Sequence, residues 1–77
     1  MSNQPLSTDI SIAINGEERR VPSDLNILKL VSHLGLDPAR VAVELNRKLV
    51  RKAQWEETAV EAGAAVEIVT FVGGGAR

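Results

Sequence analysis

The residues with the clearest chemical potential lie at the end of the chain, where positions 73–75 are all glycine and are followed by Ala76 and Arg77. An apolar segment over 66–72 runs into these glycines without an intervening linker. Glycine has no side chain and the widest backbone freedom, so a glycine tail can enter a narrow channel that any Cβ atom would block. Such a tail would present a terminal carboxylate to a reaction centre on another protein.

The composition excludes several other kinds of chemistry. The chain has 77 residues, 44% of them hydrophobic, which predicts one small domain. It contains no cysteine, so disulfides, thiolate metal sites and a cysteine nucleophile are excluded. Nine basic and ten acidic residues are interspersed and give a net charge of −1, a balance that does not favour binding to nucleic acid. The polar start and the lack of long apolar runs predict a cytoplasmic protein without a membrane segment.

No set of residues in the sequence forms a recognisable catalytic or metal-binding motif. His33 is the only histidine and has no second ligand at a metal-binding spacing, so we interpret it as structural. No nucleophile and base pair, phosphate-binding loop or matched carboxylate pair can be assembled. We therefore expect no catalytic residue, no metal site and no enzymatic activity in this chain itself.

The elements that must position the tail follow from the periodicity of the apolar residues. Alternation over 10–14, 41–45 and 66–71 predicts three half-buried strands. The pair Asn15-Gly16 predicts a tight hairpin turn, followed by a return strand over 17–21 that Pro22 closes. A turn at Asn46-Arg47 and a short extended piece over 48–50 follow the middle strand, and a helical turn is expected around Trp55.

One helix is predicted between the second and third strands. Ser23 or Asp24 is expected to cap its N-terminus, and Gly35 to end it. Its apolar stripe repeats at three-residue steps and consists of Leu25, Leu28, Val31 and Leu34, widened by Ile27 and Leu30.

This order of elements predicts an α+β fold of the β-grasp (ubiquitin-like) kind. The expected roll has a mixed four- to five-stranded sheet with one main helix across one face and a flexible Gly-rich C-terminal tail. The first and last strands are expected to pair in parallel at the centre of the sheet. The domain is predicted over 9–72, after a disordered lead-in over 1–8 and before the flexible tail over 73–77.

Several segments, taken in order, carry a resemblance that covers roughly Ile10 to Gly75. They are Val41–Asn46, Val50, Trp55, Val66–Val69 and Phe71–Gly75, with the hairpin at Ile14–Glu17 and the apolar helix positions before them. This ordered set resembles the ThiS family, the small sulfur carriers of thiamine biosynthesis. The chain departs from the family pattern at Asn46-Arg47, where Asn-Gly is common, and at Arg51-Lys52, where Pro-Arg is common.

The resemblance implies a carrier protein that acts as co-substrate of partner enzymes. The carboxylate of Gly75 would be adenylated by an E1-like (ThiF-like) adenylyltransferase and then converted to a thiocarboxylate. The sulfur would pass to a ThiG-like thiazole synthase, which builds the thiazole ring of thiamine. Gly73 and Gly74 would thread the tail into these partners. ATP and Mg would be used by the activating partner, and no cofactor would be bound tightly by this chain.

Two residues extend beyond the glycine that carriers of this family normally expose. With Ala76 and Arg77 attached, the terminal carboxylate belongs to a bulky charged residue, so Gly75 becomes the working terminus only after both are removed. Either the chain is a proform trimmed by a peptidase, or the two residues were added for expression. Both explanations remain open at this point.

Apolar residues next to the tail predict where partners dock. Val69, Phe71 and Val72 lie at or beyond the end of the last strand, and the alternation places Val69 and Phe71 on its open face, opposite Val66 and Ile68. Apolar side chains in such a position have little core to fill, and we expect them to form a docking patch for the activating enzyme and the sulfur acceptor.

Three other functions are compatible with the same features. A related carrier for molybdopterin or another thiolation pathway would share the fold and the tail chemistry. A ubiquitin-like modifier would be joined to lysines through Gly75. A plain β-grasp interaction module would have an idle tail, and its function would not change on deletion of residues 73–77.

Overall fold

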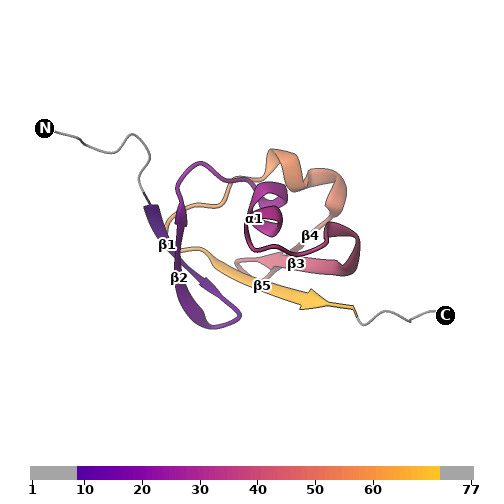
Figure 1. Ribbon diagram of the computed structural model, residues 1–77, viewed down its shortest axis with the longest axis horizontal. Helices are drawn as coiled ribbons and strands as arrows, with labels where there is room; N and C mark the ends of the chain where they lie inside the picture. The colour runs from indigo at the N-terminus through magenta and orange to yellow at the C-terminus, as the bar shows by residue number, and fades with distance from the viewer. Residues whose placement is uncertain (1–8, 72–77) are drawn as a thin grey trace, which may run out of the picture.

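A computed structural model describes residues 9–71 of the chain; the predicted lead-in over 1–8, Val72 and the predicted tail over 73–77 lie outside the described residues. Five strands form one sheet in the order β2-β1-β5-β3-β4 (Figure 1). Their bounds are β1 Asp9–Ile14, β2 Glu17–Pro22, β3 Val41–Leu45, β4 Lys48–Val50 and β5 Ala65–Thr70. With one main helix, this mixed sheet is the β-grasp fold that the sequence predicts.

The predicted pairing of the first and last strands is confirmed. β5 pairs in parallel with β1, where Ala13 lies opposite Ala65 and Ile14 opposite Val66. On its other edge β5 pairs antiparallel with β3 from Val66 to Thr70, which covers the whole length of β3. The last strand therefore occupies the centre of the sheet, between the β1–β2 hairpin and the β3–β4 hairpin.

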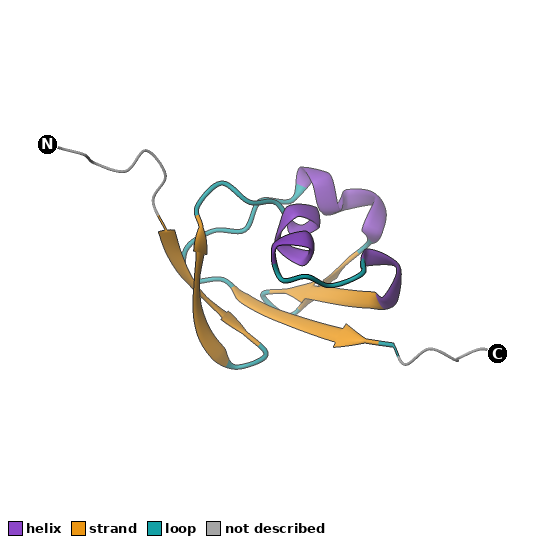
Figure 2. Ribbon diagram, viewed as in Figure 1, coloured by secondary structure: helices purple, strands orange, loops and turns teal. Residues whose placement is uncertain are grey.

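The main helix α1, Ile27–His33, lies across one face of the sheet (Figure 2). Its side chains that face the sheet are Ile27, Leu30 and Val31, each with an exposed fraction of 0%. The predicted stripe is therefore partly wrong, because Leu25, Leu28 and Leu34 are only partly buried and pack around the edge of this core. A helix of two turns offers few positions that point directly at the sheet, and the residues predicted to widen the stripe occupy two of them.

The predicted N-cap is wrong by two residues or more. Asn26, and not Ser23 or Asp24, caps α1: its side chain accepts a hydrogen bond from the Lys29 N–H at 2.8 Å. The reason lies outside the local sequence. Leu25 and Ile27 are hydrogen-bonded to the backbone of the segment before β5, with the Val60 N–H donating to the Leu25 C=O at 3.0 Å. These long-range bonds hold residues 23–25 outside the helix.

The predicted C-terminal end of the helix is confirmed. Gly35 has φ +76°, and its N–H donates to the Ser32 C=O while the Leu36 N–H donates to the Val31 C=O. These are the two hydrogen bonds of a Schellman motif, in which glycine is the preferred residue at the left-handed position. The chain then continues through a short 3-10 helix, Pro38–Arg40, which was not predicted.

Trp55 is the largest fully buried side chain of the core. It lies in a 3-10 helix, Lys52–Glu57, and its side chain is 1% exposed. The indole Nε1–H donates to the Val50 C=O at 2.9 Å, so its polar atom is satisfied although the ring is buried. The expectation of a helical turn around Trp55 is confirmed. Within residues 9–71, no helix has the length and hydropathy needed to cross a membrane.

The difference in burial between two helix leucines predicts a difference in stability. Leu30→Ala should lower the free energy of unfolding by about 2–5 kcal/mol, because it leaves a cavity beneath the helix. Leu28→Ala, at a partly buried position on the same helix, should cost less than half as much. Urea unfolding of both variants measures the two values, and equal losses would contradict the helix orientation described above.

Candidate functional site

The candidate site is the outgoing end of β5, because this strand leads directly to the glycine tail. Val66 and Ile68 point into the core, while Glu67 and Val69 lie on the opposite face and are exposed. Phe71, the last described residue, donates its N–H to the Arg40 C=O at 2.7 Å. The strand thus remains attached to the domain up to two residues before Gly73.

The backbone groups of β5 alternate between its two neighbours. The Phe71 N–H points to Arg40, next to the start of β3, so the odd-numbered residues of the strand turn toward β3. The even-numbered residues turn toward β1, where the Val66 C=O accepts from the Asn15 N–H at 2.8 Å. β1 ends at Ile14, so the next groups on this edge, those of Ile68, have no strand beside them.

Asn15 supplies the missing partner with its side chain. Its Oδ1 accepts from the Ile68 N–H at 2.7 Å, and its Nδ2 donates to the Ile68 C=O at 3.1 Å. The carboxamide therefore replaces one backbone residue of a neighbouring strand. Asn15 has φ +52°, a left-handed conformation that asparagine tolerates better than most residues, and this turn directs its side chain to β5.

Asn46, in the turn between β3 and β4, likewise binds the backbone at the start of β5. Its N–H donates to the Ala65 C=O at 2.7 Å, and its Oδ1 accepts from the Ala65 N–H at 2.9 Å. Asn46 also has a positive φ, +51°, and so does its neighbour Arg47, at +73°. An asparagine in each hairpin turn therefore attaches β5 to its neighbour, a role that turn propensity alone does not reveal.

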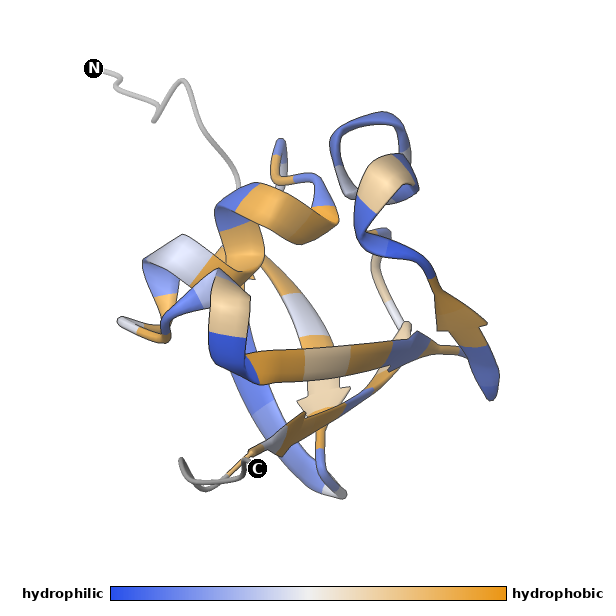
Figure 3. Ribbon diagram, turned by 90° about the vertical axis from the view of Figure 1, so that its right-hand side faces the viewer, coloured by the Kyte–Doolittle hydropathy of each residue, from blue (hydrophilic) through white to orange (hydrophobic). Residues whose placement is uncertain are grey.

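Exposed apolar side chains gather on the face of the sheet opposite α1. Leu49, Val69 and Phe71 are 66%, 58% and 55% exposed. Ala42 connects them, because it lies opposite Val69 across the strands and lines a shallow hollow of about 230 Å³ with Leu49 and Phe71. We call these four residues the apolar patch. Figure 3 views the molecule from the end at which β5 leaves the sheet, and it shows hydrophobic stretches in the strands below the helices.

Charged residues border the apolar patch on two sides. Glu44 and Glu67 are exposed and lie directly opposite each other on β3 and β5. Arg51 and Lys52 line the same hollow as Leu49, with the Lys52 Nζ 5.6 Å from the centroid of the Trp55 ring. Like charges opposite each other weaken a sheet slightly, so the glutamate pair does not serve the pairing of these strands.

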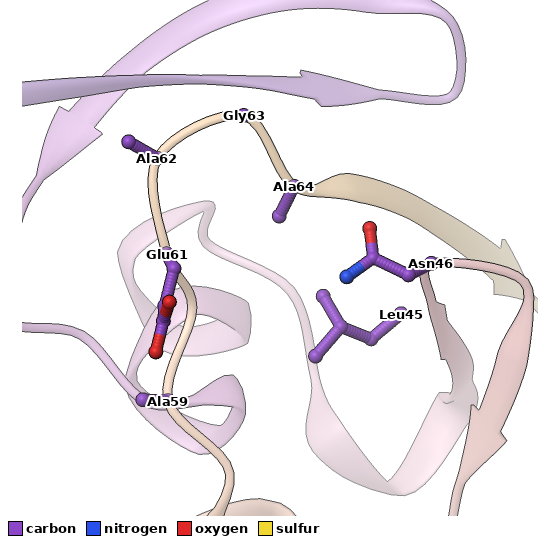
Figure 4. Close-up of a pocket in the computed structure, with 7 residues that line it drawn as sticks. All are labelled: Leu45, Asn46, Ala59, Glu61, Ala62, Gly63 and Ala64. Carbon is purple, nitrogen blue, oxygen red and sulfur yellow. The ribbon is translucent and has the colours of Figure 1, made fainter.

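A larger hollow, of about 320 Å³, lies beside the start of β5. The residues that line it are Leu45, Asn46, Ala59, Glu61, Ala62, Gly63 and Ala64 (Figure 4). The Asn46 carboxamide faces the Ala64 end of the loop, where its oxygen accepts the hydrogen bond from Ala65. Glu61 is the one ionisable residue of this lining. A single exposed carboxylate provides neither a nucleophile and base pair nor a cation for an anionic ligand.

The structure places the sequence-predicted residues as follows. Val69 and Phe71 share the open face of β5, as expected, whereas Val72, Gly73, Gly74 and Gly75 lie outside the described residues. His33 is exposed at the end of α1. Across residues 9–71, no three His, Cys, Asp or Glu side chains lie close enough together to hold a metal ion. Leu49 was not predicted as an exposed apolar residue of this face, because a strand of three residues has no readable period.

Comparison with known proteins gives a consistent result. The model of the ThiS family matches residues 8–75. A crystal structure of the thiamine biosynthesis protein (ThiS) from Geobacter metallireducens is 33% identical, has a TM-score of 0.75, and is matched over 86% of this chain and 100% of its own. An uncharacterized protein, ycf40, from Porphyra purpurea is 34% identical over 70 residues, 91% of this chain and 99% of its own length.

A second kind of relative is much longer than this chain. A thiazole synthase from Paramagnetospirillum magneticum is 41% identical over 66 residues, which are 86% of this chain and 20% of that protein. A thiazole synthase from Magnetococcus marinus is 30% identical over the same shares. This chain therefore spans about a fifth of the length of these relatives.

The role of Asn15 can be tested without disturbing its backbone conformation. Asn15→Gly keeps a residue suited to φ +52° but removes both side-chain bonds to Ile68, and should cost about 1–3 kcal/mol of stability. Exchange of the Ile68 amide hydrogen should accelerate as well. Arg47→Gly is the matched control, since it places glycine at φ +73° in the other hairpin turn, and should leave stability unchanged or raise it by up to about 1 kcal/mol. Equal losses in both variants would show that glycine itself, and not the lost carboxamide, is responsible.

Proposed function

We propose that this chain, which belongs to the ThiS family, is a carrier protein of thiamine biosynthesis that transports sulfur on its C-terminal glycine. The observation that carries the proposal is the position of β5. This strand is paired on both edges, ends beside an exposed apolar patch, and continues directly into Gly73, Gly74 and Gly75. A rigid domain thereby ends in a segment that a partner's channel can accept.

The proposed reaction takes place at the carboxylate of Gly75. A carboxylate is a poor electrophile, so an E1-like adenylyltransferase first joins it to AMP from ATP, with release of pyrophosphate. A sulfur nucleophile then attacks the acyl carbon and AMP leaves. Hydrosulfide gives the thiocarboxylate directly, whereas a persulfide gives an acyl disulfide, which a thiol reductant must cleave with formation of a disulfide to the donor. ATP and Mg belong to the activating partner in this scheme, and this chain is a co-substrate and not the catalyst.

A thiazole synthase is the proposed acceptor of the sulfur. Two relatives that carry this name contain, within one long chain, a segment similar to almost the whole of this protein. A carrier and its acceptor that act in succession gain effective concentration when they are linked in one chain. The fused arrangement thus supports a thiazole synthase as partner, in preference to the acceptors of molybdopterin synthesis or another thiolation pathway.

Ala76 and Arg77 must be removed before the proposed reaction can start, because they occupy the position of the reactive terminus. We propose that a peptidase cleaves after Gly75 if the extension belongs to the natural protein. The arginine side chain is long and charged, so a channel shaped for glycine would exclude it.

The terminus is tested by comparing two forms of the chain. The form that ends at Gly75 should gain the mass of one sulfur in exchange for one oxygen when it is incubated with the activating enzyme, Mg-ATP and a sulfur donor. The form that ends at Arg77 should remain unmodified, and intact-mass measurement distinguishes the two. Thiocarboxylate formation on the longer form, or on neither form, would contradict the assignment of Gly75.

The apolar patch is tested by shortening Phe71. Phe71→Ala should weaken binding to the activating enzyme at least about tenfold, the loss expected when an aromatic anchor is removed from an interface, while the thermal stability stays within a few degrees. Thr70→Ala is the matched control, since Thr70 is the preceding residue on the opposite face of β5. Calorimetric titration measures the affinities. Unchanged affinity together with a large loss of stability would mean that Phe71 serves the fold and not the partner.

A further inference from the structure

Asn15 has a property that the proposed function does not use. The chain contains four asparagines, Asn3, Asn15, Asn26 and Asn46, and Asn15 alone precedes a glycine. An asparagine side chain can be attacked by the backbone nitrogen of the next residue, and glycine in that position offers no side chain to hinder the attack. No atom lies within 4 Å of the point that a Gly16 Cβ would occupy, and Asn15 itself is exposed, so solvent reaches the pair.

We propose that Asn15 is a latent deamidation site. Its hydrogen bonds to Ile68 keep the carboxamide unreactive, and the amide group is lost as ammonia only when β5 detaches from the β1–β2 turn. This inference rests on the described geometry and stands independently of the sulfur-carrier function.

The reaction needs only the chain and water. The Gly16 nitrogen gives up its proton and attacks Cγ of Asn15, forming a new C–N bond, and the Cγ–Nδ2 bond breaks with release of ammonia. The resulting cyclic imide adds one water molecule at either of its two carbonyl carbons. Opening at one carbonyl gives aspartate, and opening at the other gives isoaspartate. The net change replaces an NH₂ group by OH, with no oxidation or reduction.

The geometry explains why this reaction is suppressed in the folded chain. For ring closure the carboxamide must turn so that Cγ meets the Gly16 nitrogen, which breaks the bonds of 2.7 Å and 3.1 Å to Ile68. The backbone cannot adjust freely either, because the Asn15 N–H is bonded to the Val66 C=O at 2.8 Å. Every one of these bonds ends on β5, so attachment of the strand controls access to the reactive conformation.

The product would not restore the attachment. In aspartate, an ionised oxygen takes the place of Nδ2 and faces the Ile68 C=O, so one hydrogen bond becomes a repulsion between two acceptors. In isoaspartate, the main chain gains one atom within a two-residue turn. Either product should hold β5, and with it the start of the tail, less firmly than asparagine does.

The test compares the four asparagines within one sample of the full chain. The protein is incubated in neutral buffer, folded or in concentrated urea, and peptide mass mapping follows each asparagine. In urea Asn15 should deamidate fastest of the four. In the folded protein its rate should be at least about tenfold lower, which corresponds to an opening free energy of about 1.4 kcal/mol or more. Equal rates in the two conditions, or a faster reaction at another asparagine in urea, would overturn the proposal.

Two variants test whether the attachment of β5 protects Asn15 from deamidation. Val66→Ala shortens a side chain that is 1% exposed on β5, and should accelerate the loss of ammonia from Asn15 in native buffer by about threefold or more. Leu49→Ala changes an exposed residue of β4 and should leave the rate unchanged. If Val66→Ala does not fold, Asn15→Asp provides a second test. This variant should have a lower melting temperature than the wild type and faster hydrogen exchange at the Ile68 amide. Wild-type values for Asn15→Asp would show that deamidation does not loosen the strand.

Discussion

The whole fold depends on hydrogen bonding of β5 along both of its edges. A strand at the centre of a sheet has its backbone groups satisfied on both sides, and here the two sides are supplied by separate hairpins. Because β1 and β5 are parallel, the chain must return to the end of the sheet at which β1 begins before it enters β5. The crossover segment between these two strands contains α1 and both 3-10 helices. The buried core lies between this crossover and the sheet.

The two turn asparagines extend this pairing where the neighbouring strands end. Asn15 carries the β1 edge as far as Ile68, and Asn46 carries the β3 edge back to Ala65. Each uses its own N–H and its carboxamide on β5, so a single residue in a tight turn supplies what a longer strand would supply. The attachment is economical in residues, but it concentrates the connection of the strand in two side chains. Chemical change at Asn15 therefore acts on the same connection that holds the outgoing end of β5.

Local patterns in the sequence predict most of this fold, and long-range bonds account for the errors. Alternation over Ile10 to Ile14 and Val66 to Phe71 gave the strands and their faces, because a residue's face depends only on the period of two. The predicted position of the helix N-cap was wrong because the Val60 N–H, far along the chain, donates to the Leu25 C=O and holds Leu25 outside the helix. The side-chain bonds from Asn15 to Ile68 join residues 53 positions apart, and nothing in the Asn-Gly pair indicates them. The sequence identified Val69 and Phe71 as exposed for the same reason that it missed Leu49, since only the longer strand has a readable period.

Because side chains alternate along β5, the residues that pack the core and the residues proposed to bind partners lie on opposite faces of the strand. On β5, Val66 and Ile68 provide packing, whereas Glu67, Val69 and Phe71 project away from the core and contribute little to it. The carrier function that we propose requires recognition by an activating enzyme and then by an acceptor, and both would act on the same short C-terminal segment. In the proposed function, docking at Val69 and Phe71 would lie only a few residues along the sequence from the reactive glycine. Residues on the open face can therefore change without cost to the core, while the two asparagines and the inward residues hold β5 between its neighbours.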